Sequence, residues 1–174
     1  MRILTLIGMP GSGKSAVGRI IASRLGWNFL DTDSCIEERH GTRLQALIDQ
    51  VGDESFRRLE EGTILDLAIP EQTVISTGGS VVYSNRAMRH LASISTVIFL
   101  DAPLEAIRKH IGSEAPRGIV GMTEGGLEEL YQQRLPCYRR HAAIIVSFNC
   151  ETTEEAATKV LSALPNDLQP ADPH

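Results

Sequence analysis

The segment Gly8-Met9-Pro10-Gly11-Ser12-Gly13-Lys14-Ser15 constrains the fold more than any other feature, because it matches the phosphate-binding pattern G-x-x-x-x-G-K-[ST] in full. An apolar run precedes it over residues 3–7, and an amphipathic helical pattern follows over residues 14–25. This strand–loop–helix context is what the pattern requires, since the glycines let backbone N–H groups surround a phosphate and the helix N-terminus attracts the anion. A chance glycine-rich turn is therefore a poor explanation.

Within this pattern we expect Lys14 to reach the β and γ oxygens of ATP and the Ser15 hydroxyl to bind Mg2+. The residues expected to contact the nucleotide are Gly11, Ser12, Gly13, Lys14, Ser15 and Ala16. The loop alone indicates nucleotide binding and no more, because GTPase switches, motor ATPases and kinases all share it.

The rest of the chain alternates short apolar runs with longer helical stretches, which is typical of βαβ units on a parallel sheet. The predicted strands are residues 3–7, 28–30, 73–76, 96–100 and 143–147. The predicted helices are residues 14–25, a region over 34–69 that breaks near Gly41 and Gly52 and stops at Pro70, residues 127–141 with a kink or break at Pro136, and a last helix to about residue 164, opened by the capping-box pair Thr152 and Glu155.

The length of 174 residues suits one domain, which we expect to span residues 1–164. Residues 112–126 are rich in glycine and proline and show no clear period, so we expect a mobile lid there. The last ten residues, 165–174, hold three prolines, and we expect a disordered tail.

Composition excludes several classes of protein. A net charge of −5 argues against nucleic acid as a partner, because a phosphate backbone calls for clustered Lys and Arg. The first apolar run is too short for a signal peptide core or a membrane span. The five histidines and the three cysteines, Cys35, Cys137 and Cys150, lack metal-ligand spacing. We therefore expect free thiols in a reducing cytoplasm, and a monomer with no membrane partner.

Two carboxylates follow the second predicted strand directly. Asp31 and Asp33 stand at positions i and i+2, so in an extended chain they face the same side. They fall at the carboxyl end of a strand, where open α/β sheets bind ligands. One could hold a metal-bound water, and the other could orient a substrate hydroxyl or accept its proton. The alternative is an ordinary helix N-cap pair.

Two further segments carry candidates for the acceptor. Arg57 lies in a predicted helix, where a glutamate could hold its guanidinium toward a substrate carboxylate. The alternative is a pair of exposed i,i+3 and i,i+4 contacts with Glu60 and Glu61. Gly78 and Gly79 follow the third strand and would let another group approach the backbone closely, although a plain turn explains them equally well.

Taken together and in order, these segments resemble the shikimate kinases, among the nucleoside-monophosphate-kinase-like P-loop proteins. The similarity covers about residues 1–164, and its marks are residues 8–15 (GMPGSGKS), 29–33 (FLDTD), 56–61 (FRRLEE), 76–79 (STGG) and 134–140 (RLPCYRR). The resemblance implies a three-layer α/β/α fold with a five-stranded parallel sheet in the order 2-3-1-4-5. It also implies ATP and Mg2+ as cofactors, and phosphorylation of the 3-hydroxyl of shikimate, a small-molecule acceptor, in aromatic amino-acid biosynthesis.

The resemblance also implies roles for single residues. It assigns catalysis to Lys14, Asp33 and Arg117, and the metal to Ser15 with Asp31. It assigns ATP contacts to Lys109 and Arg117 beside the loop residues. It assigns binding of the acceptor to Asp33, Arg57, Gly78, Gly79 and Arg134. Both arginines would bind the acceptor's carboxylate, and Glu60 would hold Arg57.

The chain departs from the family pattern at two places. Ser80 stands where the family usually has a third glycine, and Arg117-Gly118-Ile119-Val120 replaces the usual Arg-Pro-Leu-Leu of the lid. Because the lid residues help to cover the acceptor, a kinase of another small hydroxy acid or polyol, such as a gluconate-type kinase, remains an alternative. A nucleotide-binding regulator that has lost turnover is a third interpretation.

Overall fold

The computed structural model describes residues 2–113, 119–122, 125–148 and 152–169 of the chain. Its five strands are β1 (Ile3–Ile7), β2 (Asn28–Asp31), β3 (Thr73–Ser76), β4 (Thr96–Asp101) and β5 (Ile144–Ser147). All neighbouring strands pair in parallel, in the order β2-β3-β1-β4-β5. The predicted fold class and strand order are therefore confirmed.

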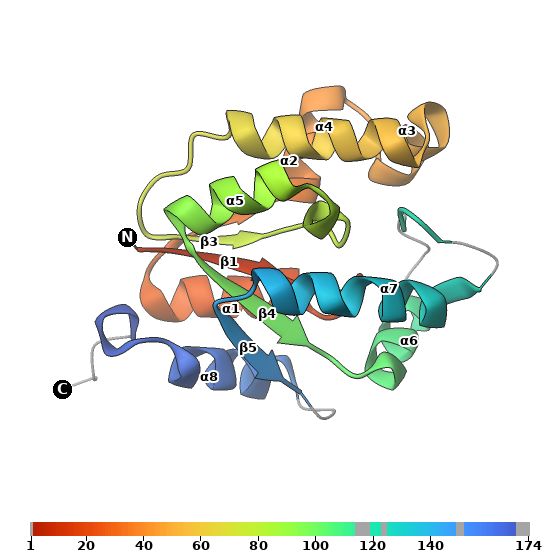
Figure 1. Ribbon diagram of the computed structural model, residues 1–174. Coiled ribbons are helices and arrows are strands. Elements are labelled where there is room, and N and C mark those ends of the chain that lie inside the picture. Colours follow the sequence, from red (N-terminus) through yellow and green to blue (C-terminus); the bar gives the residue numbers. More distant parts are fainter. Residues whose placement is uncertain (1, 114–118, 123–124, 149–151, 170–174) are drawn as a thin grey trace.

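The helices cover both faces of this sheet. They are α1 (Lys14–Leu25), α2 (Thr32–His40), α3 (Leu44–Val51), α4 (Asp53–Asp66), α5 (Asn85–Ile94), α6 (Leu104–Ser113), α7 (Gly126–His141) and α8 (Thr153–Ala163), with the short 3-10 helices η1 (Val81–Tyr83) and η2 (Asn166–Leu168). Figure 1 shows α1 and α8 on one face and α5 and α7 on the other, while α2, α3 and α4 form a separate group beside them. In the part of the chain described, no helix is long and apolar enough to cross a membrane.

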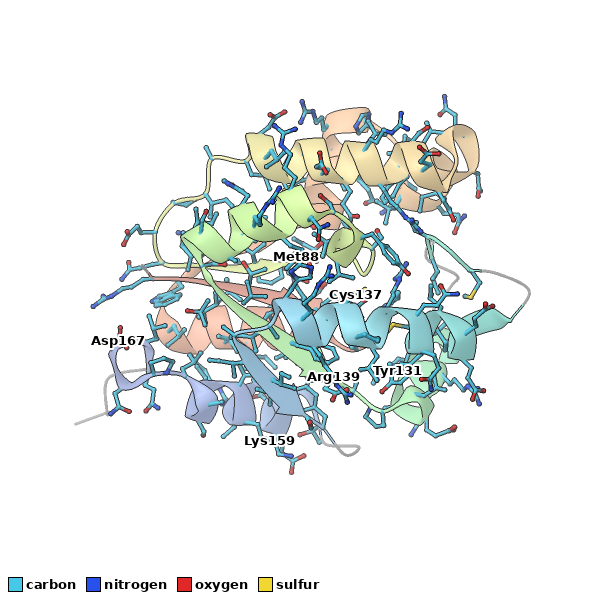
Figure 2. All side chains as sticks on the ribbon, viewed as in Figure 1. Met88, Tyr131, Cys137, Arg139, Lys159 and Asp167 are labelled. Carbon is cyan, nitrogen blue, oxygen red and sulfur yellow. The ribbon has the colours of Figure 1, made fainter. Side chains whose placement is uncertain are left out.

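The main hydrophobic core lies on both faces of the central strand. All five residues of β1 are buried, as expected for a parallel strand paired on both sides and covered by helices above and below. Met88 of α5, labelled in Figure 2, is completely buried in this core. A second, smaller core joins α2, α3 and α4, and it consists of Ile36, Leu47, Ile48, Phe56 and Val120.

Several local predictions are confirmed. The long helical region breaks at Gly41 and Gly52, where φ is +64° and +77°, a backbone conformation that glycine adopts without strain. Thr152 and Glu155 form the capping box of α8, in which each side chain satisfies a backbone N–H of the other residue.

Other predictions are wrong. The helix α4 ends at Asp66 rather than near residue 69, and Gly112 and Ser113 belong to α6 rather than to a lid. The predicted break at Pro136 is wrong, because α7 continues through it, with Leu130, Arg134 and Tyr138 recurring at four-residue spacing on its buried face. Only the first part of the predicted disordered tail is described, and it instead forms η2, where Leu168 is 6% exposed; residues 170–174 lie outside the described part.

Candidate active site

The loops that follow β1, β2 and β3 meet at one edge of the sheet. Parallel pairing aligns Ser76, the last residue of β3, with Leu6 of β1 and with Asp31, the last residue of β2. The three strands therefore end together, and their loops place residues 8–13, 32–33 and 77–80 side by side. This is the edge at which open α/β sheets bind ligands.

The P-loop approaches other backbone and side-chain atoms closely. Gly13 adopts a left-handed conformation with φ of 84° immediately before α1. Gly11, with φ of +76°, packs against α6, and a Cβ atom at this position would lie 2.9 Å from Cγ1 of Ile111. Only glycine fits both the backbone and the space there.

Lys14 and Ser15 begin the helix that follows the loop. The Lys14 ammonium is buried and donates hydrogen bonds to the carbonyl oxygens of Gly8 and Met9, at 3.0 and 2.8 Å. Burial lowers the pKa of Lys14 to about 8, although the carboxylates of Asp33 and Asp31 oppose this shift. The ammonium is thus fixed against the backbone of the loop.

Asp31 caps a helix, as one of its two interpretations expected, and it also contacts Ser15. Its carboxylate caps α2 by accepting a hydrogen bond from the backbone N–H of Asp33 at 3.0 Å. The other carboxylate oxygen accepts a hydrogen bond of 2.6 Å from the Ser15 hydroxyl, which also lies 3.2 Å from the Ser76 hydroxyl. Ser15 and Asp31, the two residues predicted to serve a metal, are therefore in direct contact.

Gly78 is more than a turn residue. Its N–H donates a hydrogen bond to the Thr32 hydroxyl at 3.2 Å. A Cβ atom on Gly78 would lie 2.7 Å from Oδ1 of Asp33 and still nearer to Oε1 of Glu60. The absence of a side chain at this position therefore lets two carboxylates approach the backbone together.

Gly79 lies between the P-loop and Arg134. A Cβ atom on Gly79 would lie 2.8 Å from Cδ of Pro10 and 2.9 Å from Nη1 of Arg134. The buried hydroxyl of Tyr138 donates a hydrogen bond to the carbonyl oxygen of Gly79 at 2.7 Å, and burial raises the pKa of this phenol. One glycine thus separates the phosphate loop from a buried guanidinium.

Arg57 and Arg134 meet although they come from different helices, α4 and α7. Their guanidinium carbons lie 4.2 and 5.2 Å from the centre of the Tyr83 ring. Arg134 is 1% exposed, and its guanidinium also donates to the carbonyl oxygen of Val120. Arg58, the neighbour of Arg57, is instead exposed and pairs with Glu54.

Glu60 does not hold Arg57 as the resemblance implied. Within the residues described, Arg57 forms no ion pair with Glu60 or Glu61, so the alternative of an exposed helical pairing is also wrong. Glu60 is 2% exposed, and its Oε2 accepts a hydrogen bond from the Ser80 hydroxyl at 2.7 Å. Burial raises the pKa of Glu60 to about 7, while the Ser80 hydrogen bond favours the charged form.

The remaining residues predicted to contact the nucleotide or form the lid show few specific contacts or lie outside the described residues. Ala16 is exposed in the first turn of α1, and Ser12 is buried with its hydroxyl lacking a hydrogen-bond partner. Lys109 is exposed on α6, the helix whose Ile111 contacts the P-loop. Arg117 and Gly118 lie outside the described residues.

Sequence reasoning missed three contributors to this site: Thr32, Tyr83 and Tyr138. Tyr138 carried a usable signal, because it stands four residues after Arg134 and so shares its face of α7. Tyr83 carried none, since η1 is only three residues long and its contacts come from α4 and α7.

Comparisons with a family model, with protein sequences and with solved structures all find similarity to shikimate kinases. A family model described as shikimate kinase matches residues 10–165. The shikimate kinase of Paracidovorax citrulli (strain AAC00-1) is 42% identical over 147 residues, covering 82% of this chain and 80% of that protein. The shikimate kinase of Thermobifida fusca (strain YX) is 34% identical over 164 residues, covering 94% and 95%. A solved shikimate kinase from Acinetobacter baumannii in complex with shikimate has a TM-score of 0.85 at 27% identity, covering 93% of this chain and 92% of that one.

The burial of Glu60 predicts a pH dependence of stability. Its pKa rises from 4.5 in the unfolded chain to about 7 in the folded protein, so folding takes up a proton between these values. This contribution to stability is complete below about pH 4.5 and is lost as the pH rises through 7. Between pH 5 and 8, the free energy of unfolding of the wild type should fall by about 2 kcal/mol because of Glu60. The Glu60→Gln variant should lack this fall.

Urea unfolding of the protein without ligands at several pH values measures this difference. The matched control is Glu54→Gln, on the exposed face of the same helix, which should follow the wild type. Parallel pH profiles for the wild type and Glu60→Gln would contradict the assignment.

Proposed function

The chain belongs to the shikimate kinase family, and from this membership we propose how its residues transfer the terminal phosphoryl group of ATP to the 3-hydroxyl of shikimate. This is a step of aromatic amino-acid biosynthesis, and the chain is a small-molecule kinase. The observation that carries the proposal is that Gly79 separates the P-loop from the Arg134 guanidinium, which shares the Tyr83 ring with Arg57. An anionic acceptor held by those groups would lie next to the bound phosphates.

On the nucleotide side, the chain supplies positive charge and N–H donors. Phosphoryl transfer passes through a loose transition state that requires positioning and charge neutralisation more than covalent chemistry. The Lys14 ammonium, fixed by the Gly8 and Met9 carbonyls, would neutralise the β and γ oxygens. The backbone N–H groups of residues 11–16 would surround the β-phosphate, with Arg117 completing the charge and Lys109 on the adenine side.

The contacts of Ser15 and Asp31 fit a magnesium ion. A hydroxyl and a carboxylate that already touch are hard oxygen ligands of the kind Mg2+ prefers. Mg2+ in kinases usually takes only one or two protein ligands and completes its shell with water and phosphate oxygens, so no larger cluster is needed. Ser15 would bind the ion directly and Asp31 through water, and the ion would neutralise charge on the β and γ oxygens.

On the acceptor side, the arginines, the carboxylate and the glycine backbones have separate roles. Arg57 and Arg134 would bind the shikimate carboxylate by charge-assisted hydrogen bonds. The carboxylate of Asp33, which faces Gly78, would orient the 3-hydroxyl and accept its proton. The backbones of Gly78 and Gly79 would complete the contact surface.

Ser80 and Val120, the described residues at the two departures from the family pattern, are compatible with this acceptor. The Ser80 hydroxyl is engaged by Glu60. Val120 of the altered lid is 4% exposed and packs with Phe56 in the second core, so it covers the acceptor side as an apolar lid residue should. We place the activity in the cytoplasm, where ATP is available. We further propose a monomer, since the large hydrophobic side chains exposed in the described ranges are confined to Met122 and Ile145.

An acceptor panel tests the function. ADP formation should be measured at saturating ATP and Mg2+ with shikimate, quinate and gluconate, and the product identified by phosphorus NMR. We expect shikimate to give the highest kcat/KM and a single 3-phosphate product. Absence of ADP above background with shikimate, while another acid gives turnover, would contradict the assignment and favour the gluconate-type alternative. No turnover with any acid would favour a regulator.

The arginine pair predicts a selective loss of acceptor affinity. Arg57→Ala should weaken shikimate binding by about 1.5–3 kcal/mol, the usual contribution of a hydrogen bond to a charged group. The KM for ATP should change little, because Arg57 contacts the acceptor side. Arg58→Ala is the matched control, since Arg58 is exposed and pairs with Glu54. Equal losses in the two variants would show that Arg57 has no specific role.

A further inference from the structure

Two cations share one aromatic ring at the acceptor site. The ring of Tyr83 lies 4.2 Å from the guanidinium carbon of Arg57 and 5.2 Å from that of Arg134, both within the range of a cation–π interaction. The Nε of Arg134 also donates to the Tyr83 hydroxyl at 3.4 Å, a long hydrogen bond. The short helix η1, directly after the Gly78-Gly79-Ser80 turn, carries this ring to the meeting point of α4 and α7.

The ring is the main feature that fixes Arg57 in the structure. The Nε of Arg57 is buried and has no hydrogen-bond partner, and across the described ranges its guanidinium forms no ion pair. Glu60, three residues later on the same helix, is hydrogen-bonded to Ser80 through Oε2. Like charges repel, so two guanidinium groups need a favourable partner to stay together, and the face of the Tyr83 ring supplies one.

We propose that Tyr83 is a positioning residue that holds Arg57 and Arg134 as a preformed pair for the acceptor's carboxylate. The proposal rests on the proposed function and adds a residue to it. Without the ring, the two like-charged guanidinium groups would repel each other and move apart. The acceptor would then have to bring them back together in order to bind. Its affinity would fall, while the transfer step itself would be unaffected.

Substitution of the ring gives the first test. Tyr83→Leu should raise the KM for shikimate about 3- to 30-fold, the range for two cation–π contacts in a partly desolvated site, with kcat and the KM for ATP nearly unchanged. Tyr83→Phe keeps the ring and should stay within about threefold of the wild type. The matched control is Tyr131→Leu, because Tyr131 is also half-buried but packs against the main core from α7 (Figure 2).

A second test keeps the shape of the ring and so does not depend on the folding of Tyr83→Leu. Phenylalanines with one, two or three ring fluorines at position 83 weaken the negative face of the ring stepwise. The KM for shikimate and its calorimetric Kd without ATP should rise with each fluorine. Unchanged values across the series would overturn the role of Tyr83. Failure of the wild type to phosphorylate shikimate in the same assay would instead contradict the proposed function.

Discussion

Three buried charged side chains, Lys14, Glu60 and Arg134, determine how the rest of the site is arranged. A buried ion is tolerated only where hydrogen bonds and opposite charges replace its water. Lys14 has the carbonyls of the P-loop, Glu60 has the Ser80 hydroxyl, and Arg134 has the Val120 carbonyl. Each partner comes from a different loop, so the three loops must close on one another for the charges to be satisfied.

This closure links the nucleotide side to the acceptor side. Gly79 lies against both Pro10 in the P-loop and Arg134. The Tyr138 hydroxyl donates a hydrogen bond to the carbonyl oxygen of Gly79. On the acceptor side, the N–H of Gly121 donates to Asp53 at the start of α4 at 2.6 Å, which anchors the segment that carries Val120. A side chain added at Gly79 would push Pro10 and Arg134 apart, so this residue sets how closely the P-loop approaches the Arg134 guanidinium.

The sequence predicted what depends on local spacing and missed what depends on packing. The turn of the P-loop, the Asp31 cap offered as an alternative and the capping box of α8 involve residues close together in the chain, and all three are present. The helix α5 was missed although the signal is present, since Ser84 caps it and Ala87, Met88 and Leu91 lie on its buried face. The pairing of Glu60 with Ser80 joins residues twenty positions apart, and helix periodicity pointed to Arg57 instead. Val120 was assigned to a mobile lid because composition does not reveal the second core that buries it.

We infer that one edge of the sheet holds two separable sites, one for phosphate at Lys14 and one for the acid at the arginine pair. Lys14→Met tests it most directly, with single-turnover transfer to shikimate and calorimetric shikimate binding measured on the same folded protein. Loss of one positioned charge at the transition state predicts a fall in the transfer rate of at least about 100-fold, with the Kd for shikimate within a few-fold of the wild type. Transfer at a near-normal rate would contradict the account.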